Sequence, residues 1–172
     1  MSSRTSDHPA PTARLAFRCW RDDDLPLARA LFGDPRVTAL VGGPFDDAAV
    51  RARLAAEIGN QRVHRLQYWP LFLREATNDF VGCCGLKPRA PDVHELGFYI
   101  VPAQWRRGFA IEAARAVIAH AWDALGARAL FAGHHPDNVA SRRTLEALGF
   151  RYTHDELYPP TGREHPGYEL RR

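Results

Sequence analysis

A glycine directly after two arginines opens a predicted helix near the middle of the chain. The stretch QWRRGFAIEAA, residues 104–114, places Arg106, Arg107 and Gly108 ahead of apolar residues at helical spacing. The first N–H groups of a helix lack partners within the helix and carry partial positive charge. Because Gly108 has no Cβ, a ligand can approach the backbone closely. The stretch indicates a site for a phosphate or pyrophosphate, and a turn glycine beside solvent-exposed arginines is the alternative.

This loop matches neither of the two common nucleotide-binding signatures. No GK[ST] follows the glycine, and the pattern GxGxxG is absent from the chain. A Walker A loop needs its lysine at the terminal phosphates, and a dinucleotide fold needs its glycines for close approach to the pyrophosphate. The sequence therefore disfavours nucleoside triphosphate hydrolysis and hydride transfer.

The loop is predicted to connect a strand to a helix. Residues 94–101 read as a strand, and residues 108–125 carry a helical apolar stripe that Gly126 closes. A strand over residues 127–134 and a capped helix over residues 138–148 follow. A strand, a helix and a second strand in this order form a crossover, which makes the two strands parallel.

The remaining segments supply the rest of an α+β fold. We predict strands over residues 13–20, 68–75 and 80–87, a tight turn at 76–79, and two strands near the C-terminal end. Helices are predicted over residues 21–33 and 45–66, the second frayed or broken near Gly59 and Asn60. We expect helices over a mixed sheet in one domain of residues 13–172, preceded by a disordered polar tail of residues 1–12.

The composition is that of an ordinary soluble domain. Apolar residues make up 45% and charged residues 25% of the chain, and no apolar run is long enough to span a membrane. The net charge of +3 comes from scattered arginines, so we expect neither nucleic acid nor a membrane as partner. Cys19, Cys83 and Cys84 form no CxxC pair and no metal-ligand pattern. We expect reduced thiols, no metal and a cytoplasmic location.

Two motifs at a fixed distance resemble a known enzyme family. The stretch YIVPAQWRRGFAIEAA, followed about 30 residues later by NVASRRTLEALGF, resembles the GNAT acetyltransferases, in the branch similar to the ribosomal-protein N-acetyltransferases RimJ and RimL. The family's acetyl-CoA motif, R/Q-x-x-G-x-G/A, falls on residues 105–110. Trp105 stands where the general motif has Arg or Gln, and an aromatic residue is usual there in this branch. The similarity extends over nearly all of the chain from Ala13 onward.

The resemblance implies a fold, a cofactor and its binding residues. The fold is a mostly antiparallel mixed sheet of about six or seven strands flanked by about four helices, and the cosubstrate is acetyl-CoA. Its pantetheine arm would pair with the backbone of the strand before the loop, and its pyrophosphate would lie on the loop and the helix N-terminus. The implied cofactor-binding residues are Phe98, Tyr99, Ile100, Trp105, Arg106, Arg107, Gly108, Phe109, Ala110, Asn138 and Ser141.

Acetyl transfer to an amine needs a group that removes a proton, because an amine is largely protonated at neutral pH. Glu95, on the strand leading into the site, is the first candidate, since the branch often carries a glutamate near this position. Strand alternation sends His94 to the opposite face. His134 and His135, at the end of the next strand, are further candidates, and an ordinary surface carboxylate is the alternative reading of Glu95.

The departing thiolate also needs a proton. Many GNAT enzymes supply it from a tyrosine seven residues after the motif asparagine, and that position is Leu145 in this chain. The resemblance implies instead that Ser141 lies near the sulfur, although a serine at a first helical turn can equally be a cap. Asn138 would cap the helix and touch the pantetheine arm. An acetyl-cysteine route through Cys83 or Cys84 is disfavoured, because no base accompanies either thiol.

The sequence predicts an N-acetyltransferase acting by direct attack of a primary amine, with Glu95 and Ser141 as catalytic residues. The alternative is a catalytically weak acyl-CoA-binding regulatory module, which the missing tyrosine supports. The amine is either a protein N-terminus or a small molecule. Related proteins are frequently dimers, so the resemblance also implies a homodimer. We expect the acceptor cleft between the first two helices, the loop at residues 89–93 and the C-terminal loop, with these candidate contacts: Trp69, Asp92, Glu156, Tyr158 and Tyr168.

Overall fold

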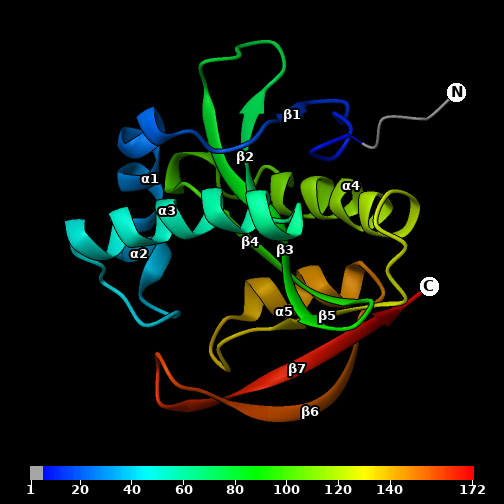
Figure 1. Cartoon of the computed structure of the whole chain (residues 1–172). Coiled ribbons are helices and arrows are strands. Elements are labelled where there is room, and N and C mark those ends of the chain that lie inside the picture. Colours follow the sequence, from blue (N-terminus) through cyan, green and yellow to red (C-terminus); the bar gives the residue numbers. More distant parts are fainter. Residues whose placement is uncertain (1–5) are drawn as a thin grey trace, which may run out of the picture.

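The computed structural model describes residues 6–172, which form one seven-stranded sheet with helices on both faces (Figure 1). The strand order is β1-β2-β3-β4-β5-β7-β6. Within the described chain, β4 and β5 are the one parallel pair, and every other neighbouring pair is antiparallel. The predicted α+β fold, with its single crossover and mostly antiparallel sheet, is confirmed.

The strands and helices follow one another along the chain largely in the order that the periodicity indicates. The strands are β1 (Leu15–Phe17), β2 (Tyr68–Leu73), β3 (Phe80–Ala90), β4 (Val93–Ile100), β5 (Ala129–Gly133), β6 (Arg151–Tyr158) and β7 (Arg163–Arg171). The helices are α1 (Leu25–Phe32), α2 (Pro35–Thr38), α3 (Asp47–His64), α4 (Phe109–Asp123) and α5 (Val139–Ala147), with single 3-10 turns at Asp22–Asp24 and Pro102–Gln104. Among residues 6–172, none of these helices has the length and apolar character needed to cross a bilayer.

The structure differs from the expected elements at three places. The first strand pairs only over Leu15–Phe17. The first predicted helix ends at Phe32, and the separate short helix α2 follows it. Helix α3 runs uninterrupted through Gly59, where a Cβ would meet nothing within 4 Å. Gly59 therefore faces open space, and the buried side chains of Val50 and Leu54 hold the helix on the sheet.

The N-terminal segment also differs from the expected disordered tail over its described part. Residues 1–5 lie outside the described residues. The Asp7 carbonyl accepts hydrogen bonds from Gln61 Nε2 and Trp69 Nε1, both at 3.0 Å. The Thr12 hydroxyl donates to Glu112 Oε1 of α4 at 2.5 Å. Residues 6–12 are thus fixed to α3, β2 and α4 by contacts with segments that are distant in sequence.

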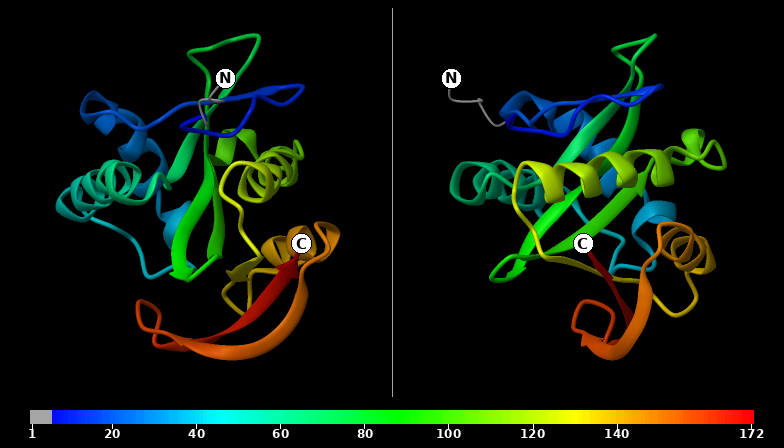
Figure 2. Two further views of the ribbon diagram at one scale, coloured as in Figure 1. Left: turned by 45° about the vertical axis from the view of Figure 1, so that its right-hand side comes forward. Right: turned by 90° about the vertical axis from the view of Figure 1, so that its right-hand side faces the viewer.

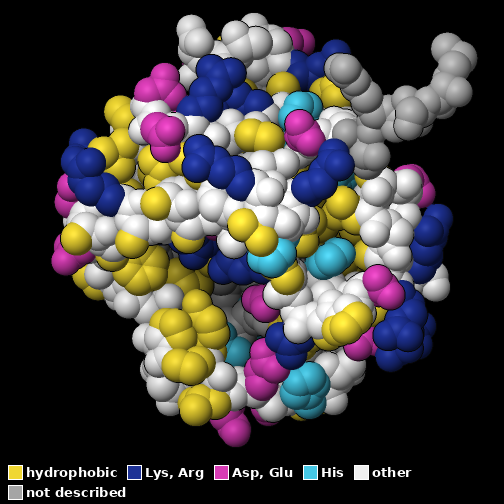
Figure 3. Space-filling model, viewed as in Figure 1, with side chains coloured by type: hydrophobic (Ala, Val, Ile, Leu, Met, Phe, Trp, Pro, Cys, Tyr) yellow, Lys and Arg dark blue, Asp and Glu magenta, His cyan; other side chains and the backbone are white. Residues whose placement is uncertain are grey.

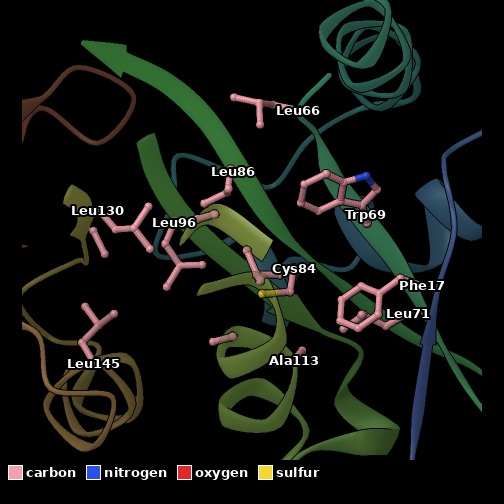
Figure 4. Close-up of a cluster of buried hydrophobic side chains, with 14 of the residues drawn as sticks. Phe17, Leu66, Trp69, Leu71, Cys84, Leu86, Leu96, Ala113, Leu130 and Leu145 are labelled. Carbon is pink, nitrogen blue, oxygen red and sulfur yellow. The ribbon is translucent and has the colours of Figure 1, made fainter. Parts of the chain in front are cut away.

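Each face of the sheet carries its own apolar core. Figure 2 shows α3 on one side of the central strands and α4 on the other. On the α4 face, Cys84, Leu86 and Leu96 pack with residues of α4 such as Ala113 (Figure 4). On the α3 face, Tyr68, Cys83 and Tyr99 pack with residues of α1 and α3. Alternate residues of one strand thus belong to different cores, because side chains alternate across a sheet.

Candidate active site

Strands β4 and β5 separate part-way along their length. They pair only at three positions, Val93 with Ala129, His94 with Leu130, and Glu95 with Phe131. Val101 N donates to Val81 O of β3, so alternation assigns the polar groups of Leu96, Phe98 and Ile100 to the edge that faces β5. Trp105 Nε1 donates to Ile100 O at 2.8 Å, which occupies one of these groups. Among the described residues no strand pairs with the β5-facing edge of β4 beyond this ladder, so the backbone groups of Phe98 and the Ile100 N–H face the gap between the strands.

A cavity of about 710 Å³ lies at this separation and reaches both faces of the sheet. Its α4-face lining includes Gly108, Phe109, Asn138 and Ser141. Figure 3 shows a surface hollowed between the helices and the β6–β7 hairpin. On the α3 face the cavity is lined by Tyr68, Glu95, Tyr99, Phe131, Glu156, Tyr158 and His165. One continuous space therefore joins the loop before α4 to the predicted base, Glu95.

Gly108 caps α4 with a backbone that glycine adopts readily. Its φ is 76°, in the left-handed region, and Glu112 N donates to its carbonyl at 3.2 Å. A Cβ at Gly108 would find only Arg14 Nη2, at 3.6 Å, within 4 Å. The N–H groups of the first helical turn lie at the cavity, since Phe109, Ala110 and Ile111 all line it. This geometry fits an anionic group held by backbone N–H donors.

The two loop arginines differ in position. Arg106 lines the cavity and has a φ of 59°. Arg107 does not line it, because its guanidinium donates to Gln104 Oε1 and lies over the Phe109 ring at 4.8 Å from the ring centroid. A third guanidinium, which the sequence did not indicate, comes from Arg14. It also lies over the Phe109 ring, at 4.5 Å from the ring centroid, and pairs with Glu112 at 2.6 Å.

The start of α5 forms the wall beside the loop. Asn138 Oδ1 accepts a hydrogen bond from Ser141 N at 3.0 Å, so Asn138 is the cap residue. The Ser141 side chain lines the cavity and does not cap the helix. Leu145, one turn further along α5, is buried and lines the cavity. It stands at the position where many GNAT enzymes have a tyrosine.

Glu95 lies on the α3 face in a group of charged side chains. Arg89 Nη1 is 3.7 Å from Glu95 Oε2, and the same guanidinium contacts both oxygens of Glu156, at 3.2 and 2.7 Å. Lys87 is the partner of Glu95 in the register of β3 and β4. Burial raises the pKa of Glu95, the nearby cations Lys87 and Arg89 lower it, and Glu156 raises it, with a net upward shift. The carboxylate therefore holds a proton more readily than an exposed glutamate.

The histidines near the site are arranged differently from one another. His134 Nδ1 lies 2.8 Å from His135 O, which requires an N–H at Nδ1, and the buried Nε2 has no partner among the described residues. His135 Nδ1 accepts from Asp137 N at 3.1 Å. Both rings line the cavity. His94 does not, and burial lowers its pKa.

A family model described as "Acetyltransferase (GNAT) domain" matches residues 14–151 of the chain. The chain belongs to the GNAT acetyltransferase family. Two Bacillus subtilis relatives span most of its length. The uncharacterized protein YkkB is 30% identical over 83% of this chain and 84% of its own. The uncharacterized N-acetyltransferase YoaA is 31% identical over 81% of each.

Solved GNAT structures have the same fold. An acetyltransferase from Agrobacterium tumefaciens superposes with a TM-score of 0.83 at 25% identity, over 100% of this chain and 99% of its own. RimJ from Mycobacterium smegmatis, solved in complex with CoA-disulfide, gives a TM-score of 0.75 at 17% identity over 96% and 88% of the chains. RimL, the ribosomal L7/L12 acetyltransferase, gives 0.80 at 13% identity over 95% and 93%. The fold resemblance to RimJ and RimL is confirmed.

Within this GNAT domain the cavity gathers most residues that the sequence singled out. Both predicted catalytic residues and every predicted cofactor-binding residue except Arg107 line it. Cys83 and Cys84 are fully buried, and burial raises the pKa of both thiols, so neither forms the thiolate that a covalent route needs. In the described chain, no cluster of His, Cys, Asp or Glu is arranged to hold a metal ion.

The predicted acceptor contacts of this GNAT domain need correction. Glu156 and Tyr158 line the cavity, but Trp69 is buried in the core on the α4 face, and Tyr168 contacts the ring of His134. Asp92 lies in the β3–β4 turn outside the cavity. The sequence also missed the contribution of α2 and the segment after it, which line the cavity with Arg36, Val37, Leu40 and Val41. No local pattern distinguished these residues, because the cavity forms from segments distant in the chain.

Proposed function

We propose that this chain is an acetyl-CoA-dependent N-acetyltransferase in which a primary amine attacks the thioester directly. One observation carries the proposal: the cavity runs between the strands from the α4 N-terminus to the Glu95 carboxylate. The backbone N–H groups after Gly108 would hold the pyrophosphate, with Arg106 adding charge. The backbone N–H and carbonyl of Phe98 would pair with the pantetheine arm. The acceptor amine would enter on the α3 face.

Three proton and charge movements follow from this arrangement. Glu95, directly or through water, takes a proton from the acceptor amine. The Ile100 N–H, on the free edge of β4, stabilises the oxyanion that develops as nitrogen attacks the carbonyl carbon. The thiolate leaves as the carbon–sulfur bond breaks, and the Ser141 hydroxyl stabilises it by donating a hydrogen bond. A proton from solvent, to which Glu95 returns the one it took from the amine, completes the free thiol. The Tyr99 phenol also lines the cavity, and burial raises its pKa to about 12, so it too remains protonated at neutral pH.

The proposal is tested by incubating the full chain with acetyl-CoA and a panel of primary amines. Release of free thiol and the mass of an acetylated amine are the expected results. Binding of acetyl-CoA with no thiol release from any amine would support the alternative, an acyl-CoA-binding regulatory module, for which Leu145 at the usual tyrosine position is the supporting observation.

Ser141→Ala is expected to lower kcat by about tenfold, the effect of about 1.4 kcal/mol in a barrier. Because Asn138 caps α5 through the Ser141 backbone N–H, alanine keeps the cap and removes only the hydroxyl. Steady-state rates with thiol detection measure the loss, and thermal unfolding checks the helix. Ser141→Thr restores a hydroxyl and should recover most of the rate. An unchanged kcat in the alanine variant would remove Ser141 from the mechanism.

Removal of the positive charge and removal of the negative charge beside Glu95 should shift the acid limb of the pH profile in opposite directions. Activity requires ionised Glu95, so kcat/KM falls as pH drops through its raised pKa. Arg89→Met removes a cation and leaves Glu156 with its contact to His154 Nε2 at 3.3 Å, which moves the acid limb to higher pH by about one unit. Glu156→Gln removes an anion and moves it to lower pH.

The other groups that face Glu95 stay the same in both variants, namely Lys87, Tyr68 and Tyr158. Glu75→Gln makes the same chemical change at an exposed turn and serves as the control. Equal shifts in both variants, or no shift in either, would show that the acid limb reports a group other than Glu95.

A further inference from the structure

The half of the cavity on the α3 face is walled by aromatic rings, and we name it the acceptor chamber, lined by Tyr68, Glu95, Tyr99, Phe131 and Tyr158. The Tyr68 and Tyr99 ring centroids are 6.0 Å apart. Phe131 is the register partner of Glu95 on β5, so its ring lies on the same face as the carboxylate. Arg89 lies over the Phe131 ring at 3.4 Å from its centroid, and His165 stacks on Tyr158 at 4.6 Å, so at most one face of each of these rings is open to a ligand. Open ring faces favour a ligand with a flat apolar body.

The charges around the acceptor chamber are already balanced. Arg89 pairs with both carboxylates that line the cavity, Glu95 at 3.7 Å and Glu156 at 2.7 Å. Behind the tyrosines, Arg53 pairs with the buried Glu57 at 2.8 Å, and at the rim Arg36 pairs with Asp34 at 2.6 Å. Lys87 Nζ lies over the Tyr68 ring at 4.8 Å from its centroid. A polycation would find no cluster of unpaired carboxylates here, and it would bring further positive charge near Arg89 and Arg36.

Two loops meet beside the acceptor chamber. Residues 36–41 line the cavity, and Gly42 directly follows them. A Cβ at Gly42, whose φ is 98°, would lie 2.7 Å from Pro160 Cβ and 2.9 Å from Pro160 O. Figures 1 and 2 show the loop after α2 beside the tip of the β6–β7 hairpin. We infer that this contact, which we name the roof, narrows the opening of the chamber on this side for a polypeptide that continues into solvent.

We propose that the acceptor is a compact primary monoamine with an aromatic body, held between the rings of the acceptor chamber beneath the roof. The amine lies at Glu95, and the body replaces water against Tyr68, Tyr99 and Tyr158. This inference rests on the proposed function and specifies the class of amine that it accepts. It excludes a polyamine by the charge balance and a protein N-terminus by the roof.

The acceptor panel separates these classes. Phenethylamine, spermidine and a hexapeptide with a free N-terminus are each assayed with the full chain and acetyl-CoA, by thiol release and product mass. We expect kcat/KM for phenethylamine to exceed that for the other two by tenfold or more, about 1.4 kcal/mol. A higher kcat/KM for spermidine or the peptide overturns this inference and leaves the proposed function intact. Thiol release from none of them, nor from any other amine tested, overturns both.

Tyr158→Ala tests whether the aromatic rings of the acceptor chamber bind the acceptor. Removal of this ring should raise KM for phenethylamine by about tenfold and leave KM for acetyl-CoA unchanged, because Tyr158 lies on the acceptor side. Leu157→Ala, at the exposed neighbouring residue of β6, is the matched control. A Tyr158→Ala enzyme with an unaltered KM for phenethylamine contradicts the proposed binding mode.

Gly42→Ala tests the roof. The new Cβ must displace Pro160, so KM for phenethylamine should rise by about tenfold while KM for acetyl-CoA stays constant. Gly162→Ala is the control, because Gly162 has a φ of 65° in the β6–β7 turn and a Cβ there meets nothing within 4 Å. It carries comparable backbone strain without the collision. If both variants raise KM for phenethylamine equally, the increase comes from strain in the loops, and the proposed role of the roof is wrong.

Discussion

Replacement of Glu95 by glutamine is expected to lower kcat/KM for the amine by about 10² to 10⁴, the usual range for loss of a positioned general base. Glutamine keeps the shape of the side chain and its place beside Arg89, but it cannot accept the proton. The expected defect lies in kcat/KM for the amine and in its dependence on pH. The acid limb that reports Glu95 should disappear, whereas the affinity for acetyl-CoA, measured by calorimetry, should be unchanged.

Two comparisons make this prediction specific. Glu75→Gln, in the exposed β2–β3 turn, makes the same substitution without contact to the cavity. His134→Asn and His135→Asn test the other cavity-lining groups that can accept a proton. If Glu95→Gln loses less than about threefold and a histidine variant loses more than tenfold, the histidine is the base. A small loss in all three variants would leave water as the proton acceptor.

The short-range signals in the sequence account for the cofactor side of the molecule. Gly126 and the apolar stripe predicted α4, and the strand, helix and strand order predicted the parallel pair β4 and β5. These two strands separate part-way along their length. Gly108 and Asn138 are the cap residues of the two helices that start beside the gap. Each of these features depends on residues close together in the chain, which is why periodicity and capping patterns identify them.

The acceptor side depends on contacts between distant segments, and the sequence predicted it poorly. Trp69 was expected to contact the acceptor, but β2 is apolar on both faces, so alternation could not assign its ring to the core on the α4 face. Arg89 and Glu156 pair across 67 positions of the chain, and no local pattern links them. The roof contact of Gly42 with Pro160 is equally remote. Helix α3 continues through Gly59 because tertiary packing outweighs a propensity cost of about 1 kcal/mol.

Gly108→Leu is expected to raise KM for acetyl-CoA by about 10- to 100-fold, or roughly 1.4 to 2.8 kcal/mol. The side chain would start at the N-terminus of α4, where the backbone N–H groups of residues 109–111 reach the cavity. It would occupy the space proposed for the pyrophosphate and keep an anion from those donors. The protein should still fold, since the nearest atom to the new Cβ is Arg14 Nη2, at 3.6 Å.

Backbone strain alone would also weaken a helix start, so the control must carry the same strain elsewhere. Gly126, at the opposite end of α4, has a φ of 64°, and a Cβ there meets nothing within 4 Å. Gly126→Leu therefore adds a similar left-handed penalty, of about 1 to 2 kcal/mol, without entering the cavity. Both variants should lose thermal stability to a similar extent, and only Gly108→Leu should lose affinity for acetyl-CoA. A Gly108→Leu protein that binds acetyl-CoA normally would return this glycine to the role of a turn residue and place the anion elsewhere.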